Sequence, residues 1–325
     1  MNRPDCVRGA TIGAVVAAIG FAAVGCLPPD PTTVLAQTPR TPVGERGVRL
    51  ARDPCSKQPV LAAPVDIGAH ATWLIIDTGA FRHVLSDNYA RTHKLGRSGE
   101  KIRVGDGAGL DADVLSPLRL AMPGVGVVPD TTILALDAAI VGDCGTAGVL
   151  SPQRLVVDGQ AVVIDLERRV LRVTTGVDAL QSLDGVWLTP EVGVAPDPFE
   201  GFVVDAEIAG KTARLVVDTG SCCTTIHPDT EAGRSLEPLA READTGLRDI
   251  QDDTASALAE GIGVTAGGVR RTVDVFLMDH RTKDQHGVLG IDFLRGCSLA
   301  FVGARMFARC HTSPATVAGN QGTPR

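Results

Sequence analysis

The chain has 325 residues, of which 44% are hydrophobic and 21% are charged, and its formal net charge is −7 at pH 7. A chain of this length and composition can bury a substantial core and is long enough for about two domains. The charge is negative and Lys and Arg do not gather in a run, so nothing supports nucleic-acid binding and no nucleic-acid partner is expected.

Residues 1–25 have the pattern of a signal peptide. Arg3 and Arg8 precede an apolar or small stretch, residues 11–25, that is too short for a comfortable membrane span. Small residues suit cleavage before Cys26, and Ala-Val-Gly-Cys resembles a bacterial lipobox in which Cys26 would be lipidated. The protein is therefore expected to be exported to the cell envelope, either lipid-anchored or periplasmic or extracellular. An ordinary cleaved signal and an uncleaved anchor remain alternatives.

Residues 26–54 are predicted to be a stalk that need not fold, because they show little apolar periodicity and are rich in proline. The prolines are Pro28, Pro29, Pro31, Pro39, Pro42 and Pro54. At the other end, residues 312–325 are polar and are predicted to form a flexible tail.

Two similar stretches stand out, LIIDTGA at 74–80 and LVVDTGS at 215–221. In each, an aliphatic run ends in Asp-Thr-Gly plus a small residue, which predicts a buried strand that delivers a carboxylate to a tight turn. One such tripeptide is a weak signal, since strands often end in these residue types. Two copies at the same place in a longer repeat make Asp77 and Asp218 the candidate functional residues.

The repeat relates residues 55–175 to residues 201–311. Each half begins with a predicted hairpin, turning at Gly68-Ala69 in the first half and at Ala209-Gly210 in the second, whose second strand ends at the Asp. A short strand and a helix start follow, with Ser86 as the expected N-cap in the first half and Pro228 in the expected first helical turn in the second.

Next in each half comes a Gly-rich or polar hairpin. In the first half it contains Gly105, Asp106 and Gly107, and its looser counterpart lies at 245–258. Because Gly and Asp supply turns but few core contacts, these hairpins are predicted to be mobile flaps.

A β-rich segment and a small apolar motif follow in both halves. Asp77 to Gly148 is 71 positions, and Asp218 to Gly287 is 69. Each half then closes with a predicted hairpin, and the Pro- and Gly-containing residues 176–200 are predicted to be the linker. The sequence thus predicts an all-β fold with two lobes related by a pseudo-twofold axis.

Over roughly residues 55–311 the chain resembles an aspartic protease of the retropepsin-like or pepsin-like superfamily. The matching features are the two Asp-Thr-Gly-Ala/Ser tetrads and an apolar-apolar-Gly motif about seventy residues after each, intact as Val288-Leu289-Gly290. The resemblance implies two homologous β-barrel lobes of the acid-protease type. A chain that carries both lobes is expected to act as a monomer with pseudo-dimeric lobes.

The resemblance also implies a function, hydrolysis of a peptide or protein substrate by an aspartic endopeptidase in which Asp77 and Asp218 form the catalytic dyad. It requires neither a metal nor a cofactor. Residues next to the dyad are expected to brace the two loops or to let backbone approach the carboxylates: Thr78, Gly79, Ala80, Thr219, Gly220 and Ser221.

Three features depart from the family pattern. Ser151 stands where the first apolar motif should have Gly, so packing behind Asp77 is expected to differ. Tyr89 falls too early to be the flap tyrosine of pepsins, which favours the retropepsin side. The tetrads end in Ala80 and Ser221, and we expect the Ser221 hydroxyl to donate to the second carboxylate and leave Asp77 as the proton holder.

Export makes the cysteines candidates for disulfides. Cys297 and Cys310 flank a predicted hairpin that places them opposite each other, so we predict that they are bonded. Cys55 and Cys144 are a second candidate pair. The adjacent Cys222-Cys223 is expected to be buried or disulfide-bonded, with its pairing open, because no metal-binding spacing accompanies it.

The main alternative is a catalytically silent protein on the same fold that binds an extended peptide by strand addition. A structural envelope component, with both Asp residues as turn formers, is a third interpretation that the long repeat disfavours. Serine-hydrolase and phosphate-loop motifs do not occur, and the seven histidines lack zinc-binding spacing.

Overall fold

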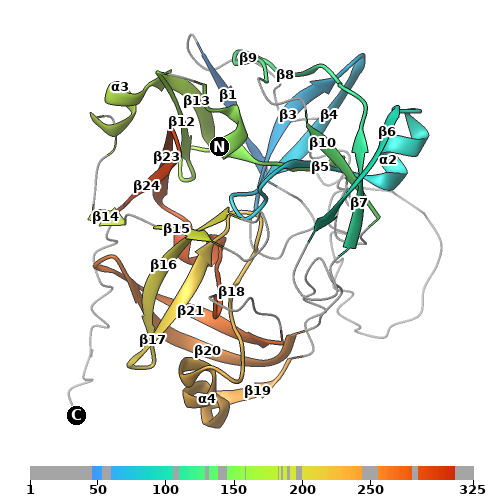
Figure 1. The fold of residues 1–325 in the computed structure, drawn as a ribbon. Coiled ribbons are helices and arrows are strands. Elements are labelled where there is room, and N and C mark those ends of the chain that lie inside the picture. Colours follow the sequence, from blue (N-terminus) through green and yellow to red (C-terminus); the bar gives the residue numbers. More distant parts are fainter. Residues whose placement is uncertain are drawn as a thin grey trace, which may run out of the picture.

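The computed structural model describes residues 46–52, 60–104, 110–128, 132–137, 145–157, 159–181, 183, 186–188, 191–194, 200–243, 255–279 and 285–311. Strands arranged in three sheets dominate these residues, and the helices are short (Figure 1). The prediction of an all-β, two-lobe fold is therefore confirmed. None of the helices in the described ranges is long and apolar enough to cross a membrane.

The N-terminal lobe is a ten-stranded sheet at the top of Figure 1. Its first long hairpin joins β3 (Leu61–Ile67) to β4 (His70–Ile76) through Gly68, whose φ of +60° suits glycine. The strand order is β6-β7-β10-β5-β11-β4-β3-β8-β9, and β2 pairs with β3. The further strands are β2 (Ala51–Arg52), β5 (His83–Ser86), β6 (Arg97–Val104), β7 (Leu110–Leu115), β8 (Leu120–Met122), β9 (Gly126–Val127), β10 (Ile133–Leu136) and β11 (Gly148–Leu150).

The C-terminal lobe is an eight-stranded sheet in the order β15-β16-β17-β22-β18-β21-β20-β19, and an added pairing of β16 with β20 closes it into a barrel. The order β17-β22-β18-β21 repeats β4-β11-β5-β10 of the first lobe, with the same parallel and antiparallel pairings. The strands are β15 (Glu191–Val194), β16 (Glu200–Ile208), β17 (Lys211–Val217), β18 (Thr224–Ile226), β19 (Ala240–Glu242), β20 (Ala255–Ala266), β21 (Val269–Met278) and β22 (Gly287–Leu289).

A third sheet of six strands, in the order β1-β13-β12-β23-β24-β14, joins the two halves of the chain. Its centre is the antiparallel pairing of β12 with β23, in which Val163 lies opposite Ala300. The closing hairpins of the two halves therefore pair with each other. The strands are β1 (Gly47–Arg49), β12 (Gln160–Asp165), β13 (Val170–Thr175), β14 (Val186–Leu188), β23 (Cys297–Val302) and β24 (Arg305–Cys310).

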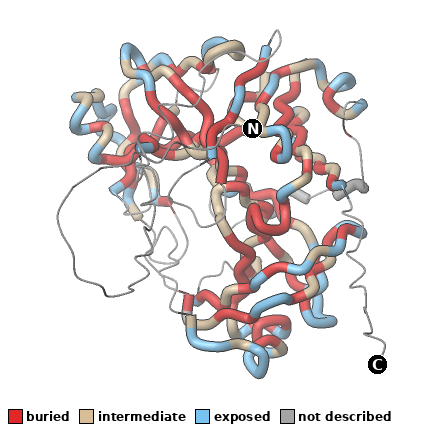
Figure 2. Tube along the Cα trace, turned by 180° about the vertical axis from the view of Figure 1, so that it is seen from behind, coloured by how far each residue is buried: buried red, intermediate tan, exposed pale blue. Residues whose placement is uncertain are grey.

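Buried residues run through both lobes and through the region where they meet (Figure 2). One continuous apolar cluster includes strands of all three sheets. At the junction, the rings of Phe202 from β16 and Phe301 from β23 pack edge to face with centroids 5.6 Å apart. The lobes are thus fixed against each other by burial as well as by the shared sheet.

Helix starts agree with the sequence in one lobe and differ in the other. In α2 (Asp87–Thr92) the N-cap is Ser86, whose hydroxyl accepts from the Tyr89 N–H, as predicted. The second-lobe helix α4 (Glu231–Leu236) is capped by Thr230, so the placement of Pro228 in its first turn was wrong. A threonine hydroxyl that accepts the Gly233 N–H decides this start. The remaining helices are η1 (Pro152–Leu155), α3 (Gly176–Gln181), η2 (Glu237–Leu239) and α5 (Ile291–Leu294).

Two predicted boundaries differ from the structure. The segment predicted as a stalk, 26–54, includes β1 and β2 near its end. The segment predicted as a linker, 176–200, contains α3, β14 and β15. At the sheet edges, β1 pairs with β13 and β14 with β24, each more than a hundred positions away along the chain, whereas β15 and β2 pair with the next strands, β16 and β3. Backbone pairing, and not their composition alone, determines the conformation of these segments.

The Cys297–Cys310 disulfide is present across the β23–β24 hairpin, as predicted. The adjacent Cys222 and Cys223 are bonded to each other. Cys26, Cys55 and Cys144 lie outside the described residues, as do the signal peptide, most of the stalk and the tail.

Candidate active site

Asp77 and Asp218 leave equivalent strands at equivalent points. Asp77 follows β4, which runs parallel to β11, and its N–H donates to the Leu150 carbonyl at 3.0 Å. Asp218 follows β17, parallel to β22, and donates to the Leu289 carbonyl at 3.1 Å. The two apolar motifs recognised in the sequence are the strands that hold the two Asp residues.

Two threonines lock the loops together through four reciprocal hydrogen bonds. The Thr78 hydroxyl donates to the Val217 carbonyl at 2.6 Å and accepts the Thr219 N–H at 3.0 Å. The Thr219 hydroxyl donates to the Ile76 carbonyl at 2.7 Å and accepts the Thr78 N–H at 3.2 Å. Both side chains are buried, so neither set of bonds competes with water. The backbone of each Asp loop is therefore held by the other lobe.

Each glycine of the tetrads packs against the carboxylate of the opposite loop. A methyl group on Gly79 would lie 2.8 Å from Cγ of Asp218, and one on Gly220 would lie 2.6 Å from Cγ of Asp77. Real carbon atoms do not approach so closely, so only glycine permits this arrangement. The two carboxyl groups consequently converge across the lobe boundary, within hydrogen-bonding reach of each other.

Backbone donors fix one oxygen of each carboxyl group. Oδ1 of Asp77 accepts the Ala80 N–H at 2.8 Å, and Oδ1 of Asp218 accepts the Gly220 N–H at 2.7 Å. The pKa of Asp77 is raised well above its usual value, first by burial and then by the charge of Asp218 and a hydrogen bond with it, while the N–H groups of Ala80 and Gly79 oppose this rise. These effects together favour the protonated form of Asp77.

The reason expected for this assignment was wrong. The Ser221 hydroxyl does not donate to Asp218; it donates to the Cys223 carbonyl at 2.8 Å and braces the turn that contains the Cys222–Cys223 disulfide. The raised pKa of Asp77 comes from its burial and its proximity to Asp218. The Ser221 hydroxyl takes no part in it, because it donates to the Cys223 carbonyl.

Sequence reasoning missed Asp292, which ties β18 to the segment that follows the Gly290 motif. This buried carboxylate accepts the Thr224 N–H at 3.0 Å and the Thr224 hydroxyl at 2.8 Å. The Thr224 hydroxyl in turn accepts the Gly290 N–H at 3.3 Å. Burial raises the pKa of Asp292, and the donors from Thr224 and Phe293 counteract the rise. Its position two residues after the Gly290 motif was the available signal.

Ser151 is accommodated in the first lobe. Its N–H donates to Nδ1 of the buried His83 at 3.1 Å, the role that Thr224 fills for Gly290 in the second lobe. A methyl group on Gly290 would collide with the Cys223 backbone, whereas Ser151 is completely buried without disturbing the bond from Asp77 to Leu150. Its hydroxyl has no hydrogen-bond partner among the described residues.

The predicted flap is a hairpin of β6 and β7, but its tip, with Gly105, Asp106 and Gly107, lies outside the described residues. Most of the predicted flap of the second lobe, before β20, does so too. Within the described ranges, no three His, Cys, Asp or Glu side chains gather in a way that could hold a metal ion.

No protein-family model matches this sequence, and no curated protein does. Among solved structures, the chain is similar to the aspartic proteinase from Irpex lacteus, with a TM-score of 0.48 and 14% identity, over 81% of this chain and 96% of that chain. The all-β, two-lobe architecture follows from the three sheets themselves, independently of this likeness.

Proposed function

We propose that this protein is an aspartic-type endopeptidase in which Asp77 and Asp218 form the catalytic dyad. The observation that carries the proposal is the convergence of two carboxyl groups on loops that the Thr78–Thr219 bonds interlock across two lobes. The interlock buries two threonine hydroxyls, and the loops contain two positions that only glycine can occupy. The formation of two turns alone would require neither feature.

The chemistry follows from one proton shared between two carboxyl groups. Protonated Asp77 donates to the carbonyl oxygen of the scissile peptide and stabilises the negative charge that develops there. Charged Asp218 accepts a proton from the attacking water. Close carboxyl groups that cannot both ionise are a known means of making one acid and one base from the same residue type, and aspartic proteases are the standard example of it.

We further propose that the protein acts as a monomer on peptide or protein substrates, without a metal or cofactor. The pairing of β12 with β23 and the interlock of the two loops are contacts within one chain, so one chain supplies both halves of the dyad. Attack by a carboxylate-activated water requires no further group in this mechanism.

The test is cleavage of a peptide library by the full chain at several pH values, beside the Asp77→Asn and Asp218→Asn variants. Each variant is expected to lose about 10²- to 10⁴-fold in kcat/KM, the usual contribution of a general acid or base. The Asp205→Asn variant, which alters an exposed carboxylate on β16, is the matched control and should keep wild-type activity.

Peptide binding without cleavage by the wild-type chain would instead support the silent peptide-binding protein. Cleavage that survives both Asn substitutions would point to a contaminating protease and refute the assignment of the dyad. The assay uses the full chain because β1 (Gly47–Arg49), near the end of the predicted stalk, belongs to the third sheet.

Export and lipid anchoring through Cys26 are proposed on the sequence pattern of residues 1–26 alone. A lipid-sized mass increase on the mature N-terminus that Cys26→Ser abolishes would support the anchor. A mature chain that begins at Cys26 without added mass would support an ordinary cleaved signal.

A further inference from the structure

The two loops of the candidate dyad are held from behind in different ways. In the second lobe, the Ser221 carbonyl accepts the backbone N–H of Ile291 at 2.9 Å. Ile291 directly follows Gly290, the last residue of the apolar motif. The corresponding residue after Ser151 in the first lobe is Pro152, which has no N–H to donate. The first loop therefore cannot be held by the same backbone bond.

A side chain makes the bond that Pro152 cannot make. Nε2 of Gln153 donates to the Ala80 carbonyl at 2.6 Å. Ala80 ends the first tetrad as Ser221 ends the second, so the two carbonyls are equivalent. The next residue extends the contact, because Nε of Arg154 donates to the Phe81 carbonyl at 2.8 Å. The start of η1 thus anchors the turn that follows Asp77.

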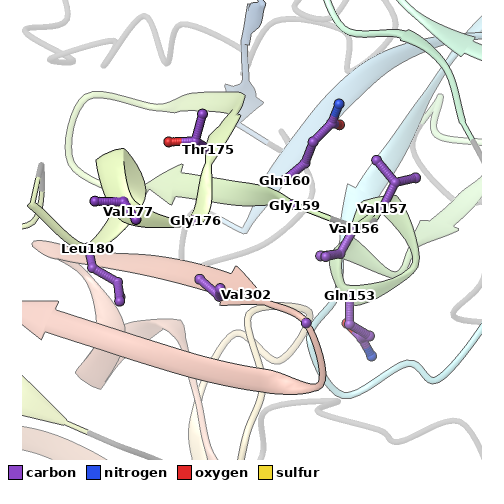
Figure 3. Close-up of a pocket in the computed structure, with 11 residues that line it drawn as sticks. Gln153, Val156, Val157, Gly159, Gln160, Thr175, Gly176, Val177, Leu180 and Val302 are labelled. Carbon is purple, nitrogen blue, oxygen red and sulfur yellow. The ribbon is translucent and has the colours of Figure 1, made fainter.

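The placement of Gln153 supports this role. Its side chain stands at one end of a cavity of about 670 Å³ between η1, the β12–β13 hairpin and α3, and its amide points away from Val156 and Val157 (Figure 3). Oε1 of Gln153 is buried and has no hydrogen-bond partner among the described residues. A buried acceptor without a partner costs free energy. The side chain nevertheless lies in the orientation in which Nε2 donates to the Ala80 carbonyl.

The bond reaches the candidate dyad through a single residue. The Ala80 carbonyl accepts from Nε2 of Gln153, and the Ala80 N–H donates to Oδ1 of Asp77 at 2.8 Å. A shift of Ala80 would lengthen the bond to Asp77, since both groups belong to the same residue. Among the described residues, no other side chain donates a hydrogen bond to the Ala80 carbonyl.

We propose that Gln153 is a positioning residue for Asp77: its side-chain amide replaces the backbone N–H that Pro152 lacks and keeps the Ala80 N–H on the Asp77 carboxyl group. This inference rests on the proposed function only where it concerns turnover. The placement of Ala80 and the ionisation of Asp77 can be measured without any substrate.

The primary variant is Gln153→Met, which keeps the length of the side chain and removes the donor. The Ala80 N–H favours the charged form of Asp77, so its weakening should make Asp77 hold its proton to higher pH. The other charged group that acts on Asp77 is Asp218, which the variant leaves in place. We expect the basic limb of the pH–rate profile to move to higher pH and kcat/KM at the optimum to fall about three- to tenfold, mainly in kcat.

Rescue distinguishes positioning from general damage. Pro152→Ala supplies a backbone N–H at the position equivalent to Ile291, so adding it to Gln153→Met should restore most of the lost activity and return the basic limb. The control is Gln160→Met, which alters a second glutamine that lines the same cavity. Oε1 of Gln160 accepts from Nη2 of Arg46 at 3.4 Å, and this bond lies outside the Asp77 loop. This variant should leave the pH profile unmoved.

The second readout is the titration of the Asp77 carboxyl carbon, followed by NMR in the full chain with labelled Asp. A higher Asp77 pKa in Gln153→Met than in wild type and Gln160→Met supports the inference even if no peptide is cleaved. An unmoved Asp77 titration together with a lower melting temperature would show a merely structural role and overturn it. Absence of cleavage by the wild-type chain, with the titration shifted as expected, would overturn only the proposed function.

Discussion

The Thr78–Thr219 interlock is the contact on which the candidate dyad depends most, and Thr219→Val tests it with little change in shape. The variant removes the hydroxyl that donates to the Ile76 carbonyl at 2.7 Å and accepts the Thr78 N–H at 3.2 Å. Both the carbonyl and the N–H are then left without this partner in a region from which water is excluded, because Thr78 and Thr219 are 0% and 1% exposed.

The expected loss of stability can be worked from these two bonds. A buried hydrogen bond contributes about 0.5–1.5 kcal/mol, and a buried donor or acceptor left unpaired costs about 1–3 kcal/mol. Thr219→Val should therefore lower the free energy of unfolding by roughly 2–4 kcal/mol. Thr78→Val removes an equivalent pair of bonds and should cost a similar amount, while the double variant should cost less than the sum because either one already separates the loops.

The assay is urea unfolding followed by fluorescence, together with kcat/KM on whichever peptide the wild type cleaves. Thr225→Val is the control: this β18 threonine is 5% exposed but takes no part in the interlock. A loss below about 0.5 kcal/mol for Thr219→Val, at an unchanged urea dependence, would refute the reasoning, since a central buried bond pair should exceed the usual effect of an isosteric change.

Three further outcomes follow from the site. Gly220→Ala should abolish cleavage, because its methyl group would lie 2.6 Å from Cγ of Asp77, whereas Gly201→Ala, with neighbours at 3.6 Å, should remain active in the same peptide assay. Ser221→Ala should leave both limbs of the pH–rate profile in place, because this hydroxyl donates to Cys223; a moved acidic limb would contradict the geometry. Asp77→Asn should be more stable than wild type at pH 7 in urea unfolding. The raised pKa of Asp77 means that the folded chain binds more protons than the unfolded chain between about pH 3.9 and the raised value, so wild-type stability falls as pH rises through that window, and equal stability of the two proteins would contradict this.

Local patterns in the sequence were sufficient for the repeated hairpins and the position of both Asp residues. An aliphatic run that ends in Asp-Thr-Gly specifies a strand and its turn through neighbouring residues alone. The hairpins β3–β4 and β16–β17, and the Cys297–Cys310 pair across β23–β24, join residues that are at most 13 positions apart in the sequence. The near-equal spacings of 71 and 69 positions then implied two lobes of one kind.

The sequence could not assign the support behind each loop. Gln153 and Ala80 are 73 positions apart, and Asp292 and Thr224 are 68 apart, so no local pattern connects either pair. The orientation of the Ser221 hydroxyl depends on whether a carbonyl or a carboxylate lies closer, which only the folded turn decides. The adjacent cysteines at 222 and 223 had several possible partners, and only the folded turn shows that they bond to each other.

By itself, therefore, the sequence determined the identity of the two candidate carboxylates, their strands and the duplicated plan, because each is encoded in short-range alternation and turn chemistry. Only the tertiary structure decided that β12 and β23 pair to join the halves, and that Pro- and Gly-rich segments become β1, β14 and β15 at sheet edges. Such composition suits an edge strand as well as a linker, and for β1 and β14 the choice depends on backbone partners more than a hundred positions away. The raised pKa of Asp77 is likewise a property of the tertiary structure, since its burial and its proximity to Asp218, 141 positions away, exist only in the folded chain.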